Sequence, residues 1–296
     1  MPYPPIETIQ NNPSLEGLAS LMPDITYSTT TGVNLRLSII LPWNHGTKEE
    51  PKRMPLIVFV QGSGWTFPNM YHEIPQLSEF ARDGYVVASV THRNATEGHP
   101  FPAYLQDVKT AIRFLRTHAD EYGIDPQKVA IWGTSSGGNT AMLVGLTPDD
   151  PQFKTEEYAD VSDAVQAVVQ CFGPTDIPAL LQSTLKAQPD LDIDAPDNLF
   201  YALCGGPASQ HPDVGEKMSP IHYIDSCPTP PPFLMLQGDA DPVVPYAQCT
   251  SMYEALCDAG VPVQMVRVAG APHEGSFWSQ TLLGRIHRFL DETVGK

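Results

Sequence analysis

The sequence predicts an α/β protein built on a doubly wound, mostly parallel β-sheet. Short apolar runs, typical of strands buried on both faces, recur along the chain. Stretches with apolar residues at helical spacing lie between these runs. Strands and helices that alternate in this way imply right-handed crossovers, with helices on both faces of the sheet. The predicted core strands are 56–60, 85–90, 129–132, 165–169, 233–236 and 263–268.

Two segments ahead of the first core strand predict an antiparallel hairpin. Residues 33–41 alternate polar and apolar and then become apolar, which indicates a strand. Residues 24–29 precede a turn at Thr31-Gly32 and would pair with that strand. A polar loop flanked by prolines follows at 43–55. We therefore expect antiparallel strands at the N-terminal edge of the sheet.

Helices are predicted where apolar residues recur with the helical period. Residues 104–116 place them at i, i+4, i+7 and i+8, so that they fall on one face of a helix. Residues 245–259 and 277–294 follow the same pattern, and 138–144 also have helical character.

One long insertion interrupts the alternation of strands and helices. Residues 174–232 mix prolines, acids and apolar clusters (Leu180-Leu181 and 199–201) with no clear core strand. An insertion of this length in a compact α/β domain is usually functional. We therefore predict a single domain over 1–296 in which 174–232 forms a lid or substrate pocket.

Composition and charge exclude several classes of function. The net charge of −17 disfavours nucleic acid, anionic lipid and polyanionic substrates, because a negative field repels them. No apolar run approaches the roughly 20 residues of a membrane helix. The N-terminus has no basic region followed by an apolar one, so a cytoplasmic location is predicted, or secretion if a leader was removed. Five cysteines without a C-x-x-C pair predict reduced, mostly buried thiols.

No metal or cofactor is predicted. Asp190, Asp192 and Asp194 are spaced like calcium ligands, but Ala195 and Tyr201 stand where a calcium loop needs Gly and Glu. This segment is therefore interpreted as a solvated acidic loop.

The motif that carries the functional prediction is Gly-x-Ser-x-Gly at 133–137. It follows the predicted strand 129–132 and precedes the helical stretch 138–144, as in a nucleophile elbow. In such a turn a side chain two residues before or after the serine would collide across the bend, so glycines make the strained turn tolerable. We therefore predict that Ser135 is a nucleophile.

A serine nucleophile needs a base that takes its proton and an acid that orients the base. In this fold class such groups follow strands directly. His273 follows strand 263–268, whereas His287 lies inside the last helix. Asp239 and Asp241 both follow strand 233–236; we favour Asp241, while Asp239 could close its own loop through an Asx-type bond. The order serine, acid, histidine is that of α/β-hydrolases.

Backbone N–H groups that could stabilise an oxyanion are expected at two places. One is Ser136, directly after the nucleophile, and the others are Ser63 and Gly64, after strand 56–60. A dinucleotide-binding loop is excluded here because Phe67 replaces the third glycine of that motif. Trp65, Phe67 and Tyr71 could wall a substrate pocket, with burial as core aromatics the alternative.

These motifs resemble those of the esterase branch of the α/β-hydrolase superfamily. More narrowly, they are similar to bacterial carboxylesterases known as feruloyl or acetylxylan esterases. The resemblance extends from about Ile25 to the end and implies the α/β-hydrolase fold, with Ser135 as nucleophile, Asp241 as acid and His273 as base. Many relatives have His-Gly-Gly-Gly where this chain has Gln61-Gly-Ser-Gly64, so Ser63 narrows that space. The segments that carry the resemblance are 61–65, 99–107, 132–138, 238–245 and 270–273.

The function predicted is cofactor-independent hydrolysis of carboxylic esters through an acyl-enzyme. The substrate would be a small-molecule or oligosaccharide ester, such as a feruloyl or acetyl ester of xylan; no nucleic acid or membrane partner is expected, and the sequence indicates no oligomeric state. A prolyl-type peptidase is an alternative, although it would carry a propeller ahead of this domain. A dienelactone-type hydrolase expects Cys at position 135. A non-catalytic binding protein on the same fold would typically lack one of the three residues.

Overall fold

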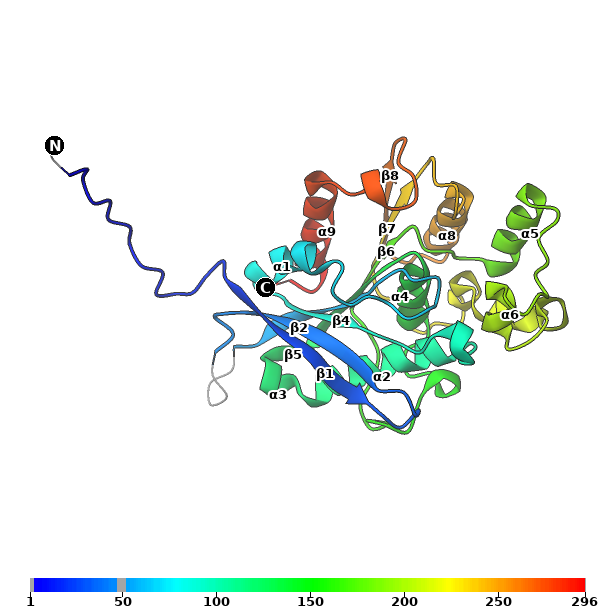
Figure 1. Cartoon of the computed structure of the whole chain (residues 1–296), viewed down its shortest axis with the longest axis horizontal. Helices are drawn as coiled ribbons and strands as arrows, with labels where there is room; N and C mark the ends of the chain where they lie inside the picture. Colours follow the sequence, from blue (N-terminus) through cyan, green and yellow to red (C-terminus); the bar gives the residue numbers. More distant parts are fainter. Residues whose placement is uncertain (1–2, 47–51, 296) are drawn as a thin grey trace.

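The computed structural model describes residues 3–46 and 52–295. Its centre is an eight-stranded sheet in the order β1-β2-β4-β3-β5-β6-β7-β8 (Figure 1). β2 pairs antiparallel with β1 and β4, and the remaining pairs are parallel. The predicted mostly parallel sheet with antiparallel N-terminal strands is confirmed. The strands are β1 (Ala19–Ser28), β2 (Leu35–Pro42), β3 (Met54–Val60), β4 (Val86–Val90), β5 (Ile124–Thr134), β6 (Ala167–Cys171), β7 (Phe233–Gly238) and β8 (Val263–Val268).

Helices cover both faces of this sheet, and each face has its own apolar cluster. Side chains of α1 and α9 pack on one face, and those of α2, α4 and α8 pack on the other. Every residue of β3 and β4 is buried, which explains their uninterrupted apolar sequence. The helices are α1 (Ile74–Arg82), α2 (Ala103–Thr117), α3 (Ala119–Tyr122), α4 (Ser136–Leu146), α5 (Ile177–Ala187), α6 (Leu199–Cys204), α7 (Pro212–Lys217), α8 (Tyr246–Asp258) and α9 (Gln280–Thr293).

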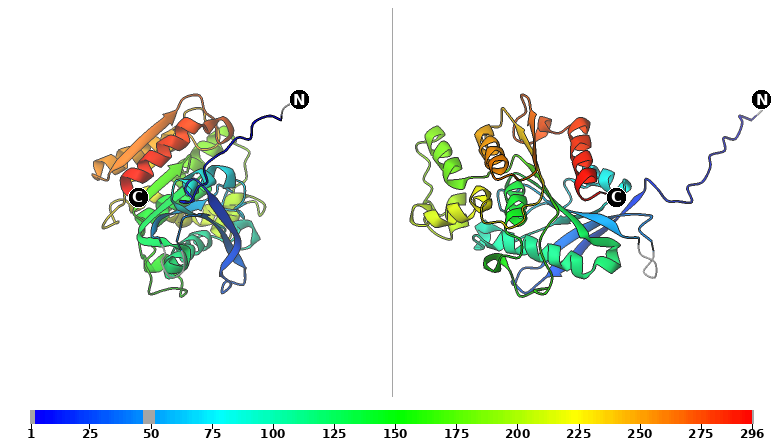
Figure 2. Two further views of the ribbon diagram at one scale, coloured as in Figure 1. Left: turned by 90° about the vertical axis from the view of Figure 1, so that its left-hand side faces the viewer. Right: turned by 180° about the vertical axis from the view of Figure 1, so that it is seen from behind.

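Several boundaries differ from the sequence-based expectation. The strand expected at 165–169 begins at Ala167, and α1 and α3 had not been predicted. The last helix begins at Gln280 because the Ser279 side chain accepts the Leu282 N–H as an N-cap. Of the loop expected at 43–55, residues 47–51 lie outside the described residues. Most of the segment ahead of β1 extends away from the body of the molecule (Figure 2), and Leu18 at its end accepts a hydrogen bond from the Trp43 N–H.

The insertion between β6 and β7 is helical. It carries α5, α6 and α7, and Figure 1 shows α5 and α6 at the outer edge of the molecule, beyond α8. One side chain attaches the start of the insertion and the residue after α7 to α4, because Asn139 Nδ2 donates to the carbonyls of Pro174 and Met218 at 3.0 and 2.8 Å. Within the described residues, no helix is both long and apolar enough to cross a membrane.

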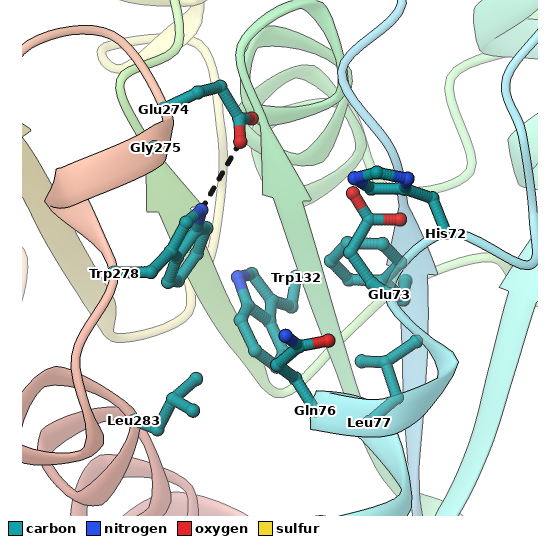
Figure 3. Close-up of a pocket in the computed structure, with 10 residues that line it drawn as sticks. His72, Glu73, Gln76, Leu77, Trp132, Glu274, Gly275, Trp278 and Leu283 are labelled. Carbon is teal, nitrogen blue, oxygen red and sulfur yellow. Dashed lines mark hydrogen bonds between the residues drawn. The ribbon is translucent and has the colours of Figure 1, made fainter.

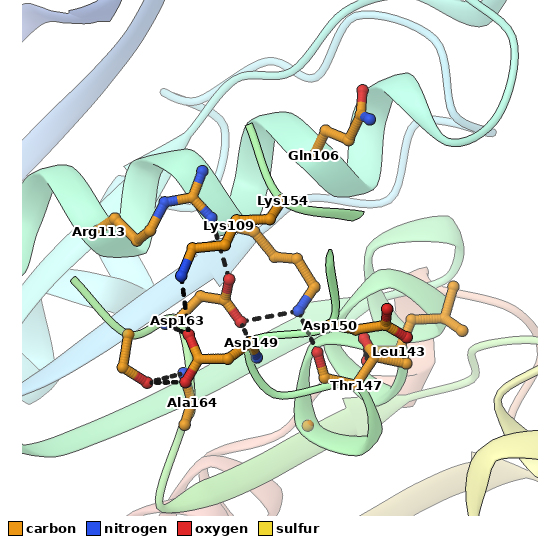
Figure 4. Close-up of polar contacts among 12 residues, drawn as sticks. Gln106, Lys109, Arg113, Leu143, Thr147, Asp149, Asp150, Lys154, Asp163 and Ala164 are labelled. Atoms are coloured by element: carbon orange, nitrogen blue, oxygen red, sulfur yellow. Dashed lines mark hydrogen bonds and ion pairs between the residues drawn. The ribbon is translucent and has the colours of Figure 1, made fainter. Parts of the chain in front are cut away.

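A buried ion cluster fixes α2 to the segment that follows α4 (Figure 4). Asp163 lies 2.8 Å from Lys109 Nζ and 3.0 Å from Arg113 Nη1, and all three side chains are 0% exposed. Burial lowers the pKa of both basic groups, and the nearby Asp163 carboxylate opposes this shift. Lys109 also donates to the carbonyl of Thr147, directly after α4. The cluster therefore supports the helix that begins at Ser136.

Asp163→Asn is expected to lower the free energy of unfolding by about 3–5 kcal/mol, because it leaves two buried cations without their anion. Urea denaturation would measure the loss. The matched control is Asp213→Asn, which removes an exposed pair with Lys217 and should cost less than about 1 kcal/mol. Equal losses in the two variants would contradict this account of the cluster.

Candidate active site

Ser135 lies in the turn between β5 and α4, with φ 49° and ψ −122°. Its N–H donates to the Cys171 carbonyl at 2.9 Å, which fixes the turn to the neighbouring strand β6. A Cβ on Gly133 would overlap the Gly137 carbonyl, and a Cβ on Gly137 would overlap the Val60 carbonyl. Glycine is therefore required at both positions, because backbone atoms lie where a side chain would begin. The strained turn lifts the Ser135 side chain away from the sheet.

The side chains of Ser135, His273 and Asp241 form one hydrogen-bonded chain. His273 Nε2 lies 2.9 Å from Ser135 Oγ, and His273 Nδ1 lies 2.7 Å from Asp241 Oδ2. A carboxylate only accepts hydrogen bonds, so Nδ1 carries the proton and Nε2 is free to accept from the serine. The three residues follow β5, β8 and β7, and the His273 ring packs edge-on against Phe172, with 4.6 Å between ring centroids.

Asp241 is held as a carboxylate. Its side chain is 0% exposed, and besides His273 it accepts from Gln237 Nε2 at 2.9 Å and from the backbone N–H of Val243 and Val244 at 2.8 and 2.9 Å. Burial alone would raise the pKa of Asp241, but the hydrogen bonds from His273 and the two backbone groups outweigh it, and the pKa falls below its usual value. Gln237 was not identified from the sequence; its position at the carboxyl end of β7 was the available signal.

Asp239 has a different partner set. It accepts from Arg267 Nε and from the Gly270 N–H, both at 2.6 Å. These bonds, the Gly270 bond first, lower the pKa of Asp239. Asp239 thus joins the loop after β7 to the loop that carries His273, rather than closing its own loop. His287 lies on α9 between Asp83 and Asp291, away from this site.

The loop after β3 brings backbone N–H groups next to the elbow. The Ser63 N–H donates to Ser136 Oγ at 2.9 Å, and the Ser63 hydroxyl donates to the Thr66 carbonyl at 2.7 Å. Gly64 and Ser136 line the same cleft as Ser135. In this structure the Ser63 N–H is therefore already hydrogen-bonded to the Ser136 hydroxyl. No sequence motif indicates this bond.

Two clefts meet at Ser135. We call the first the apolar cleft; it has a volume of about 410 Å³, and its walls come from the insertion and from the loop before α8. The second, the polar cleft, has a volume of about 480 Å³ and includes His273, Glu73 and Glu274. The residues that line the apolar cleft include Trp65, Leu180, Thr184, Leu199, Phe200 and Val243.

A rear cavity of about 190 Å³ continues the polar cleft and shares His72, Glu73 and Glu274 with it (Figure 3). Trp278 Nε1 donates to Glu274 Oε2 at 3.2 Å, so this carboxylate is oriented by an aromatic side chain. Gln61 Nε2 donates to Glu73 Oε1, whereas Glu73 Oε2 is buried without a partner in the described structure. Burial raises the pKa of Glu73, and Glu274 adds to the shift.

Of the three aromatic residues expected at a substrate pocket, the structure places one in the lining of a cleft and two outside it. Trp65 is 5% exposed and lines the apolar cleft. Phe67 and Tyr71 are 50% and 43% exposed, and neither is among the described residues that line the two clefts. Side chains of the insertion, above all Leu199 and Phe200, line the apolar cleft instead of Phe67 and Tyr71. Their apolar cluster was visible in the sequence, but the direction of those side chains was not.

Within residues 3–46 and 52–295, no group of three or more His, Cys, Asp or Glu side chains is arranged to hold a metal ion. Asp194, in the acidic segment of the insertion, instead accepts hydrogen bonds from the backbone and side chain of Ser209.

Comparison with known proteins identifies relatives among esterases. The BD-FAE family model matches residues 40–256. Esterase LipC of Mycobacterium tuberculosis (strain ATCC 25618 / H37Rv) is 32% identical over 206 residues, which cover 69% of this chain and 49% of that protein. Esterase LipQ of the same strain is 28% identical over 246 residues, covering 82% of this chain and 54% of its own length. This chain spans about half the length of the curated relatives it matches.

Two solved structures are similar over nearly the whole chain. A truncated form of a carbohydrate esterase from gut microbiota has a TM-score of 0.76 and 28% identity, covering 94% of this chain and 97% of its own. The propionate-bound thermophilic esterase Est2 of the Planctomycetes species Thermogutta terrifontis has a TM-score of 0.72 and 27% identity, covering 95% and 96%. The expected α/β-hydrolase fold is confirmed by these similarities and by the strand order.

Proposed function

Because this chain belongs to the BD-FAE family, we propose that it is a serine esterase that hydrolyses carboxylic esters through an acyl-enzyme on Ser135. The observation that carries the proposal is the continuous chain of hydrogen bonds from Ser135 through His273 to Asp241. A serine hydroxyl becomes a useful nucleophile only when such a base can take its proton.

In the first half of the reaction, His273 Nε2 takes the proton of Ser135 as Oγ attacks the ester carbonyl carbon. Asp241 stabilises the imidazolium that forms. The tetrahedral oxyanion is stabilised by the backbone N–H groups of Ser63, Gly64 and Ser136. Since the Ser63 N–H is bonded to Ser136 Oγ in this structure, the Ser136 hydroxyl turns away to release it.

In the second half, water takes the place of the leaving alcohol. His273 first gives its proton to the alcohol oxygen, and the alcohol departs to leave the acyl group on Ser135. His273 then accepts a proton from water as the water oxygen attacks the acyl carbonyl carbon. When the bond between that carbon and Ser135 Oγ breaks, His273 returns the proton to Oγ and the carboxylic acid is released. The general acid must contact the leaving oxygen, so the alcohol occupies the polar cleft that contains His273. The acyl group then occupies the apolar cleft on the other side of Ser135.

We propose further that the substrates are feruloyl or acetyl esters of xylan or similar cell-wall polysaccharides. The polar cleft and rear cavity offer two carboxylates and the Trp278 ring, groups suited to hydroxyls and to the flat face of a sugar. The apolar cleft is large enough for an aromatic acyl group. A similarity to a protein described as a carbohydrate esterase also supports this substrate class.

Ser135→Ala is expected to reduce the kcat for p-nitrophenyl acetate by roughly 10⁶-fold, because the attacking oxygen is removed. Steady-state kinetics would measure the loss, and an unchanged melting temperature would show that the fold survives. A fluorophosphonate probe should label the native chain at Ser135 and leave the variant unlabelled. Turnover retained by the variant would contradict the proposal.

Asp241→Asn is expected to lower kcat by roughly 10⁴-fold, because an amide no longer holds the His273 tautomer that accepts from serine. The matched control is Asp239→Asn, whose carboxylate contacts Arg267 and Gly270 instead. The control should keep kcat within about tenfold of the native value, since it acts only through loop position. Kinetics on p-nitrophenyl acetate would compare the two, and a reversed order of effects would exclude Asp241 as the acid.

Glu73→Ala is expected to lower the ratio of kcat/KM for a feruloylated xylo-oligosaccharide to that for methyl ferulate by roughly tenfold, the effect of losing a buried hydrogen bond to a hydroxyl. Both substrates have the same acyl group, so the ratio reports on the alcohol side alone. Glu79→Ala, on the helix that Glu73 precedes but outside both clefts, is the control and should leave the ratio unchanged. A ratio unaffected by Glu73→Ala would contradict a sugar site in the polar cleft.

A further inference from the structure

A second apolar cavity, of about 360 Å³, lies within the insertion. It is bordered by α5, α6, α7 and the short 3₁₀ helix at Ala208–Gln210, and part of it is open to solvent. Its apolar lining includes Ile177, Leu181, Leu185, Phe200, Leu203 and Met218. We call it the inner cavity.

Helix α5 separates the inner cavity from the apolar cleft beside Ser135. Leu180, Thr184 and Ala187 of this helix line the apolar cleft, whereas Leu181 and Leu185 line the inner cavity. At about 100° per residue these two sets fall on different faces of one helix. Only Ile177 and Leu180 of its eleven residues are buried. Helix α5 therefore makes few buried contacts, and it lies between the apolar cleft and the inner cavity.

Phe200 borders both spaces. It lies on α6, where its neighbour Leu199 lines only the apolar cleft and Leu203 lines only the inner cavity. The side chain of Phe200 therefore stands between the cleft that reaches Ser135 and the inner cavity. A change of its side-chain rotamer, with no movement of the backbone, could join the two.

The chemistry of the inner cavity selects an apolar occupant. Polar side chains such as Ser209 and Glu216 occur in its wall, but its lining is predominantly apolar. None of the buried polar atoms without a partner in the described residues belongs to that wall. An apolar cavity of this kind favours hydrocarbon over water.

We propose that the inner cavity is an extension of the acyl site, with Phe200 as the partition, and that it receives the distal carbons of linear acyl chains too long for the apolar cleft. This inference rests on the proposed esterase function, because it places the carbonyl end of the chain at Ser135. The substrate class that it adds is esters of medium-chain fatty acids, of about eight to twelve carbons, since each methylene moved out of water is favourable.

The test compares p-nitrophenyl esters from acetate to decanoate, each below its critical micelle concentration. The measured quantity is the ratio of kcat/KM for decanoate to that for butyrate. Phe200→Ala should raise this ratio roughly tenfold, because it opens the inner cavity permanently to the added carbons. Leu185→Trp, which fills the inner cavity from α5, should lower the ratio by a similar factor.

Two further variants complete the test: a second cavity-filling variant and a control for added bulk on α5. Ala208→Phe fills the same cavity from a different element and should also lower the ratio, so one variant that fails to fold does not decide the result. Lys186→Trp adds the same bulk one residue along α5 but lines neither space, and it should leave the ratio unchanged.

The outcomes separate this inference from the proposed function. If acetate is hydrolysed but the ratio is the same in the native chain and in the Phe200, Leu185 and Ala208 variants, the inner cavity takes no acyl chain and only the inference fails. If the native chain hydrolyses no ester at all, including acetate, the proposed function and the inference fail together. Opposite shifts in the opened and filled variants support the inference.

Discussion

The arrangement of the whole site depends on the close contact of backbone with backbone at the turn that carries Ser135. Gly133 lies against the Gly137 carbonyl and Gly137 against the Val60 carbonyl, so the start of α4 is pressed onto β3 with no side chain between them. This contact forces the positive φ of Ser135 and directs its side chain away from the sheet. It also brings the loop after β3 next to the helix, where the Ser63 N–H meets Ser136 Oγ.

The negative charges of two buried carboxylates, Asp163 and Asp241, are stabilised in different ways. Asp163 is neutralised by Lys109 and Arg113, two cations that join helix α2 to the segment after α4. Among the residues that the structure describes, no Lys or Arg pairs with Asp241, which is stabilised by N–H donors from Gln237, the backbone and His273. These hydrogen-bond donors stabilise the negative charge of Asp241 without neutralising it, so Asp241 can still stabilise a positive charge on His273.

The insertion supplies what the geometry of the elbow alone does not provide, namely the shape of the space around Ser135. Its helices are attached to α4 through Asn139, and the side chains of Leu199 and Phe200 form a wall of the apolar cleft. The opposite side of Ser135 is polar and includes Glu73 and Glu274. An ester with an apolar acid and a hydroxylated alcohol matches this asymmetry.

The sequence by itself determined the core strands, several of the helices between them, the elbow at 133–137 and a short set of partners for Ser135, because periodicity and turn chemistry are local properties. It favoured Asp241 without excluding Asp239, since both follow the same strand, and only the folded chain shows that Asp241 faces His273 while Asp239 faces Arg267. It also grouped Trp65 with Phe67 and Tyr71, although only Trp65 lines a cleft. The direction of a side chain, and which distant segment meets it, depend on tertiary packing between residues far apart in the chain. Local sequence patterns do not contain that information.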